Sequence, residues 1–364
     1  MASGRHLFRP AVDELTPYQP GKPVEDVQRE LGLTRVVKLA SNEGPFPPFP
    51  AALEAMERVE RDLNRYPDGG TFRLHEALAA RHGVAFDQVC AGSGADGCID
   101  ILSQAVLDPG DEIVLGWPSF PSYVIYAAKQ GAASVRVPLR DHRYDLAGLA
   151  SAIGPRTKLV YVCHPNNPTG TMNTREELDA FLDSVPPDVL VVIDQAYFEY
   201  VDRPDYPDAV EEYLKPGRRV LVLRTFSKIY GLAGARVGYA VGPADVCTGM
   251  AKLRRPFDVT TTAQVAALAS LGDGAELERR RALNAAGLDR LATILGDRGL
   301  SPIAGAVGNF LYVEVGDDAL ALYDRLLRRG VIVRPLAGFG APGAIRISVG
   351  TNEELDFLAA ALTS

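Results

Sequence analysis

Short apolar runs recur through the middle of the chain and alternate with segments of helical periodicity. Several runs are almost wholly apolar, such as Val-Leu-Val-Val-Ile at 189–193, which is typical of strands buried on both faces. Helical patterns at 99–106, 123–129 and 175–182 lie between runs and predict a largely parallel sheet covered by helices on both sides. The seven predicted strands are 88–92, 112–117, 134–139, 158–163, 189–194, 220–226 and 236–241.

The pattern of predicted helices and strands changes after Arg255-Pro256. A long helical region at 263–295 and strands at 310–315 and 345–349 predict a second, smaller α+β domain. The first forty residues contain four prolines, which predict an extended arm that packs on a partner subunit. We therefore expect an N-terminal arm that joins the small domain, a large domain and a C-terminal small domain, with the bounds 1–44, 45–255 and 256–364.

Length and composition narrow the class of protein. A chain of 364 residues suits two domains with a sizeable core. Its 38 basic and 46 acidic residues give a net charge of -8, which provides no long-range attraction for nucleic acid or an anionic membrane. The four cysteines form no CxxC pair and the five histidines no HExxH motif, so we expect no metal site and no disulfide framework. We expect an unanchored cytoplasmic protein, since no signal peptide or long apolar span is present.

The stretch Thr-Phe-Ser-Lys-Ile-Tyr-Gly-Leu-Ala-Gly-Ala-Arg at 225–236 places one lysine just after an apolar strand. A lysine amine in a pocket beside other cations is easier to deprotonate, and a neutral amine can condense with the aldehyde of pyridoxal phosphate. Lys228 is thus the candidate catalytic centre, and Ser227 and Arg236 are candidates to hold the cofactor phosphate. A loop lysine in solvent is the alternative interpretation.

The run Gly92-Ser-Gly-Ala-Asp-Gly97 lies between a predicted strand and a predicted helix, where backbone N–H groups can bind a phosphate. It also matches G-x-G-x-x-G, which raises an NAD-dependent dehydrogenase as an alternative of another class. That class requires an acidic residue at the end of the next strand, whereas this strand ends in Gly116-Trp117. Glycines that serve only a tight turn are the third interpretation.

Other chemistry-bearing residues follow the predicted strands. Asp194 ends a strand, at the sheet edge where open α/β folds bind ligands, and a carboxylate there would keep a pyridine nitrogen protonated. Asn167 and Tyr197 are candidates to contact the ring's phenolic oxygen, and Phe120 is a candidate to stack on the ring. The alternatives are a helix N-cap for Asp194, a plain turn around Asn167 and a core role for Phe120.

Arg346 lies within an apolar strand, Ala-Ile-Arg-Ile-Ser-Val-Gly, an unusual place for a guanidinium that does not face a cleft. Its planar fork suits a carboxylate or a phosphate. The alternative is an outward-facing arginine. Asn309 is a candidate for the same cleft, whereas Tyr18 and Tyr66 lie in loop-like sequence where a packing or solvent-facing role is the default.

The chain resembles the histidinol-phosphate aminotransferases, which are fold-type I enzymes that depend on pyridoxal 5'-phosphate. The likeness runs nearly end to end, and its motifs occur in the family's order. They are Thr16-Pro-Tyr-Gln19, Leu39-Ala-Ser-Asn-Glu43, Arg65-Tyr-Pro-Asp68, the Pro-Asn-Asn-Pro-Thr-Gly run, Asp194-Gln-Ala-Tyr197, Ser227-Lys228 with Arg236, and 345–351.

This resemblance implies a transaminase of histidine biosynthesis that moves an amino group from histidinol phosphate to a 2-oxo acid such as 2-oxoglutarate. It implies a homodimer with shared active sites, in which Tyr66 reaches the cofactor phosphate of the other subunit. Lys228 would bind the cofactor covalently, and Asp194 would pair with its ring nitrogen. The remaining expected contacts are Gly94, Ala95, Asp96, Ser227 and Arg236 for the phosphate, Phe120, Asn167 and Tyr197 for the ring, and Tyr18, Asn42, Asn309 and Arg346 for the substrate.

Two departures from the family's motifs leave related enzymes as alternatives. The family often has Asn-Glu-Asn-Pro where this chain has Asn42-Glu-Gly-Pro45, and Asp-Glu-Ala-Tyr where it has Asp194-Gln-Ala-Tyr197. The first lies in a loop expected to border the substrate. An aromatic amino-acid aminotransferase and a threonine-phosphate decarboxylase therefore remain alternatives.

Overall fold

The computed structural model describes residues 7–15 and 20–363, and it contains the predicted seven-stranded sheet. Only β8 runs antiparallel to its neighbours β2 and β7, and the other neighbouring strands are parallel. Each observed strand begins and ends within two residues of the prediction, so the apolar runs identified the sheet correctly. In spatial order the strands are β2 (Val89–Gly92), β8 (Gly238–Val241), β7 (Val220–Thr225), β6 (Leu190–Asp194), β5 (Thr157–Cys163), β3 (Glu112–Trp117) and β4 (Ala133–Pro138).

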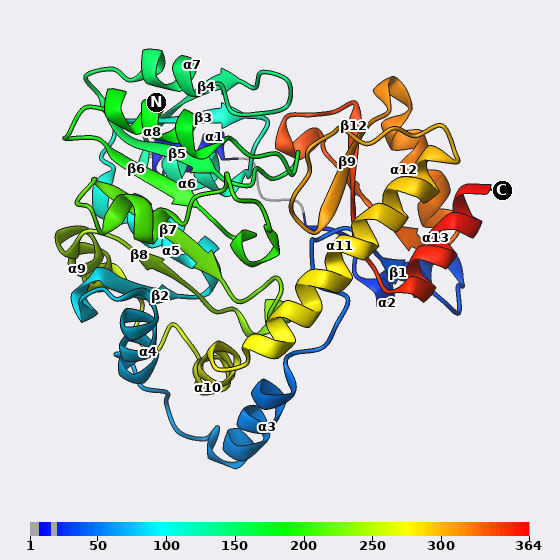
Figure 1. The fold of residues 1–364 in the computed structure, drawn as a ribbon, viewed down its shortest axis with the longest axis horizontal. Helices are drawn as coiled ribbons and strands as arrows, with labels where there is room; N and C mark the ends of the chain where they lie inside the picture. The colour runs from blue at the N-terminus through cyan, green and yellow to red at the C-terminus, as the bar shows by residue number, and fades with distance from the viewer. Residues whose placement is uncertain (1–6, 16–19, 364) are drawn as a thin grey trace, which may run out of the picture.

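Helices cover both faces of this sheet (Figure 1). On one face α5 packs against α6 and α9, and on the other α7 packs against α8. Their apolar sides and the strands form one large core in which Val114, Val160, Val192 and Val222 are fully buried. The helices are α4 (Phe72–His82), α5 (Gly94–Val106), α6 (Ser122–Gln130), α7 (Leu146–Ala152), α8 (Arg175–Ser184) and α9 (Ala244–Leu253).

The smaller unit is built on a three-stranded antiparallel sheet in the order β11 (Arg334–Pro335), β12 (Ala344–Ser348), β9 (Phe310–Glu314). Helices α11 (Gly274–Gly296), α12 (Ala319–Arg328) and α13 (Asn352–Thr363) surround it and share its core. The N-terminal segment reaches this unit, because β1 (Val37–Lys38) pairs in parallel with β10 (Val331–Ile332). The exact domain bounds stay predictions. The buried alanines of α10 (Thr261–Leu271) pack against the larger core, next to α3 (Pro50–Val59).

The helical region predicted at 263–295 is present as two helices, α10 and α11, separated at Gly272 and Asp273. The Asp273 side chain caps α11 by accepting the N–H of Glu276 at 3.0 Å. The expectation for the N-terminal segment was wrong. The first forty residues are not simply extended, because they contain α1 (Pro10–Glu14) and α2 (Val24–Leu31). Pro10 is the first residue of α1 and Pro23 directly precedes α2, positions where a missing N–H costs nothing. These prolines begin helices instead of preventing them.

The two units meet closely at Trp117 and Gly340. Gly340 has φ +90°, and a Cβ atom built on it would lie 2.0 Å from Nε1 of the Trp117 indole. Nearby, Phe120 of the larger unit packs both on the large core and on a small cluster around Phe339. Among the described residues, no helix has both the length and the apolar character that a membrane span requires.

Candidate active site

A cavity of about 340 Å³ opens at the carboxyl edge of the large sheet. Its wall contains the last residues of three neighbouring strands, Cys163 of β5, Asp194 of β6 and Thr225 of β7. Open α/β sheets bind ligands at this edge because the loops that follow the strands diverge there. The structure brings nine predicted site residues together around it: Ala95, Asp96, Phe120, Asn167, Asp194, Tyr197, Ser227, Lys228 and Arg236.

Lys228 follows β7 and extends its amine into the cavity, not into bulk solvent. Its Nζ lies 3.4 Å from the carbonyl oxygen of Ser41 and 5.6 Å from the ring centre of Tyr197. Burial lowers the pKa of this amine to about 8, and the charges of Arg346 and Arg236 contribute in the same direction. Glu43 and Asp194 oppose the shift. Lys228 is therefore readily available as a neutral nucleophile or base near neutral pH.

Asp194 is a buried carboxylate held from two sides. Tyr123 donates its hydroxyl to Oδ2 at 2.7 Å, and the N–H of Ala196 donates to Oδ1 at 3.0 Å. Burial raises the pKa of Asp194, while these two hydrogen bonds and the Lys228 charge oppose that shift. Its bond to Ala196 is local, as the N-cap alternative requires, but the residue also lines the cavity. An Asp at this place fits a ring nitrogen that carries a proton.

The start of α5 and Arg236 form a narrow cradle suited to a phosphate. Gly94 is the first residue of α5, and a Cβ on it would lie 2.9 Å from Nη2 of Arg236. A Cβ on Gly238 would lie 2.4 Å from the backbone nitrogen of Ala95. The glycines of this region therefore permit close backbone approach at a helix N-terminus, where N–H groups attract anions. The carboxylate of Asp96 accepts the Tyr126 hydroxyl at 2.6 Å. The backbone N–H of Asp96 has no partner within the helix, because the residue lies in the first turn of α5.

Thr225 completes the cradle, although the sequence analysis assigned it no role. Its Oγ1 accepts the N–H of Ser227 at 3.1 Å and lies 3.0 Å from the Ser227 hydroxyl. The residue therefore fixes the turn that presents both Ser227 and Lys228.

A chain of hydrogen bonds joins the smaller unit to the cavity. Arg346 of β12 is only 3% exposed and donates to the side chain of Asn167 and, at 2.7 Å, to the Ala40 carbonyl. Asn42 donates to the Tyr197 hydroxyl at 2.8 Å. Asn309 is buried and donates to the Asn42 carbonyl at 3.1 Å. Arg346 thus faces inward, contrary to the outward-facing alternative, and the segment that it binds at Ala40 also contains Asn42.

Among the described predicted residues, Gly94, Asn42, Asn309, Arg346 and Tyr66 are not part of the cavity lining. Tyr66 is 81% exposed and stacks on Phe257 with 4.4 Å between ring centres, so any contact with a cofactor would have to be made in another subunit. Tyr18 lies outside the described residues. The functional roles of all these side chains stay predictions.

The sequence analysis missed several cavity residues besides Thr225. Cys163 ends β5, so the strand-end rule that identified Asp194 also applies to it. Ser41 and Glu43 belong to the Leu39–Glu43 motif, and the loop that contains Glu43 was expected to border the substrate, but neither residue was assigned a role of its own. The remaining unassigned lining residues are Ala196, Ala233 and Gly234.

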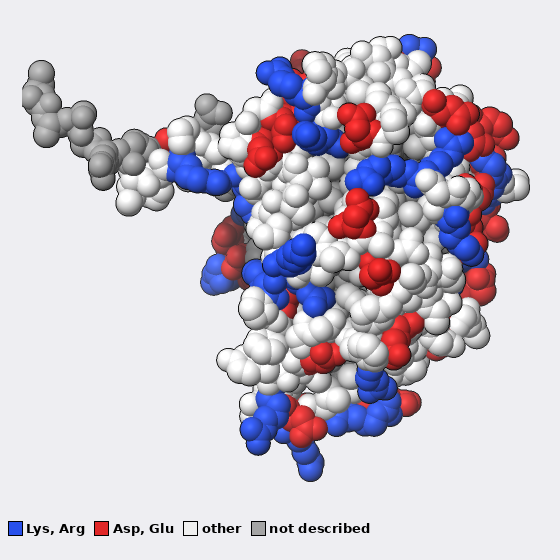
Figure 2. All heavy atoms as spheres, turned by 90° about the vertical axis from the view of Figure 1, so that its left-hand side faces the viewer, with Lys and Arg blue, Asp and Glu red and all other residues white. Residues whose placement is uncertain are grey.

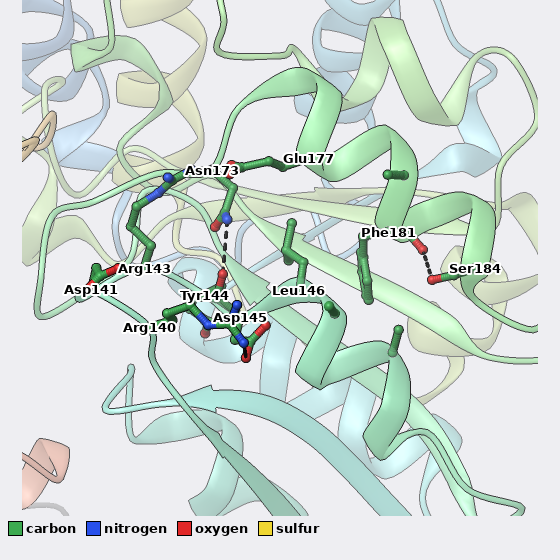
Figure 3. A pocket seen from close by; sticks show the side chains of 13 residues that line it. Arg140, Asp141, Arg143, Tyr144, Asp145, Leu146, Asn173, Glu177, Phe181 and Ser184 are labelled. Atoms are coloured by element: carbon green, nitrogen blue, oxygen red, sulfur yellow. Dashed lines mark hydrogen bonds and ion pairs between the residues drawn. The ribbon is translucent and has the colours of Figure 1, made fainter.

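A second hollow of about 550 Å³ lies between α7 and α8. Figure 3 shows its lining, where Arg143 extends toward Glu177 and Asn173 donates to the Tyr144 carbonyl at 3.1 Å. Arg140 pairs with Asp145 at 2.8 Å. Because these charged groups are already paired with one another, we place the chemistry in the cavity around Lys228.

Two other site types find no support in the described residues. No cluster of three or more His, Cys, Asp or Glu side chains there has the geometry to hold a metal ion. On the face shown in Figure 2, basic and acidic side chains are interspersed around a broad uncharged area. That face concentrates no basic surface for a polyanion.

The cavity's donor set fits pyridoxal 5'-phosphate. It combines an amine of lowered pKa, a buried carboxylate, an aromatic ring and an amide. A helix N-terminus beside an arginine lies at one end. The amine matches the aldehyde of the cofactor, the carboxylate matches its pyridine nitrogen, and the aromatic ring matches its ring face. The amide matches the phenolic oxygen, and the helix N-terminus with the arginine matches the phosphate.

Comparisons with known proteins agree with this assignment. Residues 34–362 match the family model described as aminotransferase class I and II. The chain is 44% identical to a histidinol-phosphate aminotransferase of Moorella thermoacetica, over 95% of this chain and 89% of that protein. It is 43% identical to histidinol-phosphate aminotransferase 2 of Carboxydothermus hydrogenoformans, over 95% of each chain.

A solved structure shares the fold. Histidinol-phosphate aminotransferase from Sinorhizobium meliloti, in complex with pyridoxal-5'-phosphate, superposes with a TM-score of 0.89 at 33% identity. The match covers 99% of this chain and 97% of the other.

Proposed function

Since the chain belongs to the class I and II aminotransferases, we propose that it transfers the amino group of histidinol phosphate to a 2-oxo acid such as 2-oxoglutarate, with pyridoxal 5'-phosphate as cofactor. The observation that carries this proposal is the presence of Lys228 and Asp194 in one cavity at the sheet edge. The names of the relatives and the cofactor bound in the Sinorhizobium meliloti enzyme support the choice of substrate and cofactor.

When bound, the cofactor supplies an aldehyde that condenses with amines and a protonated ring that accepts the electrons of the broken Cα–H bond. Its phosphate would lie in the cradle of Gly94, Ala95, Asp96, Ser227 and Arg236. Its ring would lie against Phe120, with Asn167 and Tyr197 at the phenolic oxygen.

The side chains of this protein would then have separate roles in binding and proton transfer. Lys228 would act as the general base at the substrate Cα, because its lowered pKa makes a neutral amine accessible. Asp194 would keep a proton on the ring nitrogen. Arg346 binds the anionic end of either substrate, the phosphate of histidinol phosphate or the carboxylate of a 2-oxo acid. Because one site serves two substrates in turn, the kinetics should be ping-pong.

We extend the proposal to assembly and location. A homodimer would allow the exposed Tyr66 to reach the phosphate cradle of a second subunit. Four free, buried cysteines suit a reducing compartment, and we propose the cytoplasm.

The substrate is tested by single-turnover reactions of the cofactor-loaded protein. Histidinol phosphate, phenylalanine, tyrosine and threonine phosphate are compared by conversion of the cofactor to its amine form. We expect histidinol phosphate to react with the highest second-order rate constant. A preference for phenylalanine or tyrosine would identify an aromatic amino-acid aminotransferase, and release of carbon dioxide from threonine phosphate would identify the decarboxylase.

A further inference from the structure

Among the described residues, three carboxylates line the active-site cavity, those of Glu43, Asp96 and Asp194. Two of them are held inside the protein. Asp96 accepts hydrogen bonds from Ser122 and Tyr126 of α6, and Asp194 is held by Tyr123 and the N–H of Ala196. Glu43 differs because its side chain pairs with the partly exposed Lys38, at 3.0 Å.

The Lys38 pair leaves Glu43 able to bind a ligand. The side chain of Glu43 is 42% exposed and that of Lys38 is 26% exposed, and ion pairs of this kind contribute little to stability. A carboxylate has about four lone-pair sites, of which one bond to Lys38 uses only a part.

The backbone of Glu43 is fixed relative to Arg346. Asn309 donates to the carbonyl oxygens of Asn42 at 3.1 Å and Glu43 at 3.5 Å. Three residues earlier in the chain, the Ala40 carbonyl accepts Nη2 of Arg346 at 2.7 Å. Three residues span at most about 10 Å, so one short segment holds an acidic group at a set distance from the buried arginine.

Both charges lie near the reacting amine. Arg346 lowers the pKa of Lys228 and Glu43 raises it, so both lie within electrostatic reach of the lysine. The cavity lining includes Glu43, Lys228 and Asn167, the side chain that Arg346 holds, so a substrate whose anion binds Arg346 shares this cavity with the carboxylate of Glu43. That carboxylate favours a hydrogen-bond donor or a cation, not a plain hydrocarbon ring.

We propose that Glu43 is a specificity-determining residue that accepts a hydrogen bond from a ring N–H of the substrate, and so selects an imidazole-bearing amine over a phenyl-bearing one. This inference rests on the proposed function. A phenyl group in the same place would cover the carboxylate without giving it a donor, and sites built around a buried polar contact reject such analogues strongly. We expect a preference of about 10-fold or more to depend on Glu43.

Equilibrium binding tests the inference without catalysis. Two ligands that lack an amine, 3-(imidazol-4-yl)propyl phosphate and 3-phenylpropyl phosphate, are titrated into the cofactor-loaded protein by calorimetry. In Glu43→Met, which keeps the side-chain length but removes the acceptor, we expect the imidazole ligand to bind at least about 10-fold more weakly and the phenyl ligand to bind within about twofold of wild type. Glu43→Gln should fall between the two, because its amide oxygen still accepts a hydrogen bond.

Two control variants separate the carboxylate from its surroundings. Glu54→Gln changes an exposed glutamate of α3, and Lys38→Met removes the ion-pair partner but keeps Glu43. Both should retain the wild-type preference for the imidazole ligand. Equal losses of affinity for the two ligands in Glu43→Met would mean that Glu43 acts through Lys228 or through folding. An unchanged preference for the imidazole ligand would mean that Glu43 does not bind the ring. Either result overturns the inference.

The proposed function can fail separately. A wild-type protein that does not turn over histidinol phosphate overturns the proposed function together with the inference. A wild-type protein that does so, and whose Glu43→Met variant keeps the imidazole preference, overturns the inference alone.

Discussion

Arg346 donates a hydrogen bond from Nη1 to the side-chain oxygen of Asn167. The two residues come from different units of the fold, one from β12 and the other from the loop after β5. Because the oxygen of the amide accepts this bond, its NH₂ group is left to face the cavity that Asn167 lines. Arg346 therefore sets the orientation in which Asn167 can donate to an oxygen of a ligand.

Asn167→Asp tests this orientation. An aspartate can still accept from Arg346, but it cannot donate into the cavity and adds a negative charge there. We expect the pH midpoint of the bound cofactor's visible absorbance to rise by about one unit or more, measured by spectrophotometric titration. Asn352→Asp, at an exposed position on α13, should leave the midpoint unchanged. A similar midpoint in both variants would contradict the assigned orientation.

Lys228→Ala should abolish covalent attachment of the cofactor. The wild-type protein should show a visible absorbance band that borohydride bleaches, and the variant should lack that band. We expect the transfer rate to fall by at least about 100-fold, the lower range for loss of a general base. Lys252→Ala, an exposed lysine of α9, is the matched control. An unchanged yellow protein would exclude Lys228 from its proposed role.

The lowered pKa of Lys228 can be measured without cofactor. Only the neutral amine reacts with trinitrobenzenesulfonate, so the reaction of Lys228 should rise as pH increases through about 8, whereas an ordinary lysine rises near 10.4. The difference in labelling between wild type and Lys228→Ala isolates this residue. In Arg346→Gln the midpoint should move upward because a nearby positive charge is lost. A midpoint near that of ordinary lysines in the wild type would contradict the effect of burial.

The phosphate cradle has no room for a methyl group at Gly238. In Gly238→Ala the new Cβ would lie 2.4 Å from the Ala95 nitrogen, so the start of α5 must move away. We expect the cofactor dissociation constant to rise at least about 10-fold, which corresponds to roughly 1.4 kcal/mol, as measured by fluorescence titration. Gly249→Ala on α9 meets nothing within 4 Å and should bind the cofactor as the wild type does. Equal affinities in both variants would place the phosphate elsewhere.

Mixed dimers test the shared active site. Tyr66→Ala and Lys228→Ala should each be weakly active alone. In a dimer that contains one subunit of each kind, one of the two sites regains both residues if Tyr66 acts across the interface. Random mixing should then restore about a quarter of the wild-type activity. A mixture no more active than its components would assign Tyr66 to its own subunit or to no site.

The sequence was most informative wherever function depends on local pattern. Apolar runs predicted all seven strands of the large sheet, and positions at or just after strand ends identified Asp194 and Lys228 as site candidates, which the structure places in one cavity. The six residues from Gly92 to Gly97 indicated a strand-to-helix turn for the same reason. The family resemblance was confirmed by the match over residues 34–362.

Features that depend on distant parts of the chain were not predictable in this way. The break between α10 and α11 depends on the cap formed by Asp273, which a helical period does not show. Glu43 enters the cavity because Asn309 and Arg346 hold its segment from the other unit. The resemblance placed the loop that begins at Asn42 near the substrate, but residues 40–43 by themselves do not indicate their partners about three hundred positions away.

The close meeting of Trp117 and Gly340 limits how this protein can vary. Every side chain at position 340 would begin inside the indole ring, and its left-handed backbone adds a second obstacle. A side chain there would push the smaller unit, which carries Arg346, away from the sheet edge. Substitutions that preserve activity must therefore leave Gly340 unchanged.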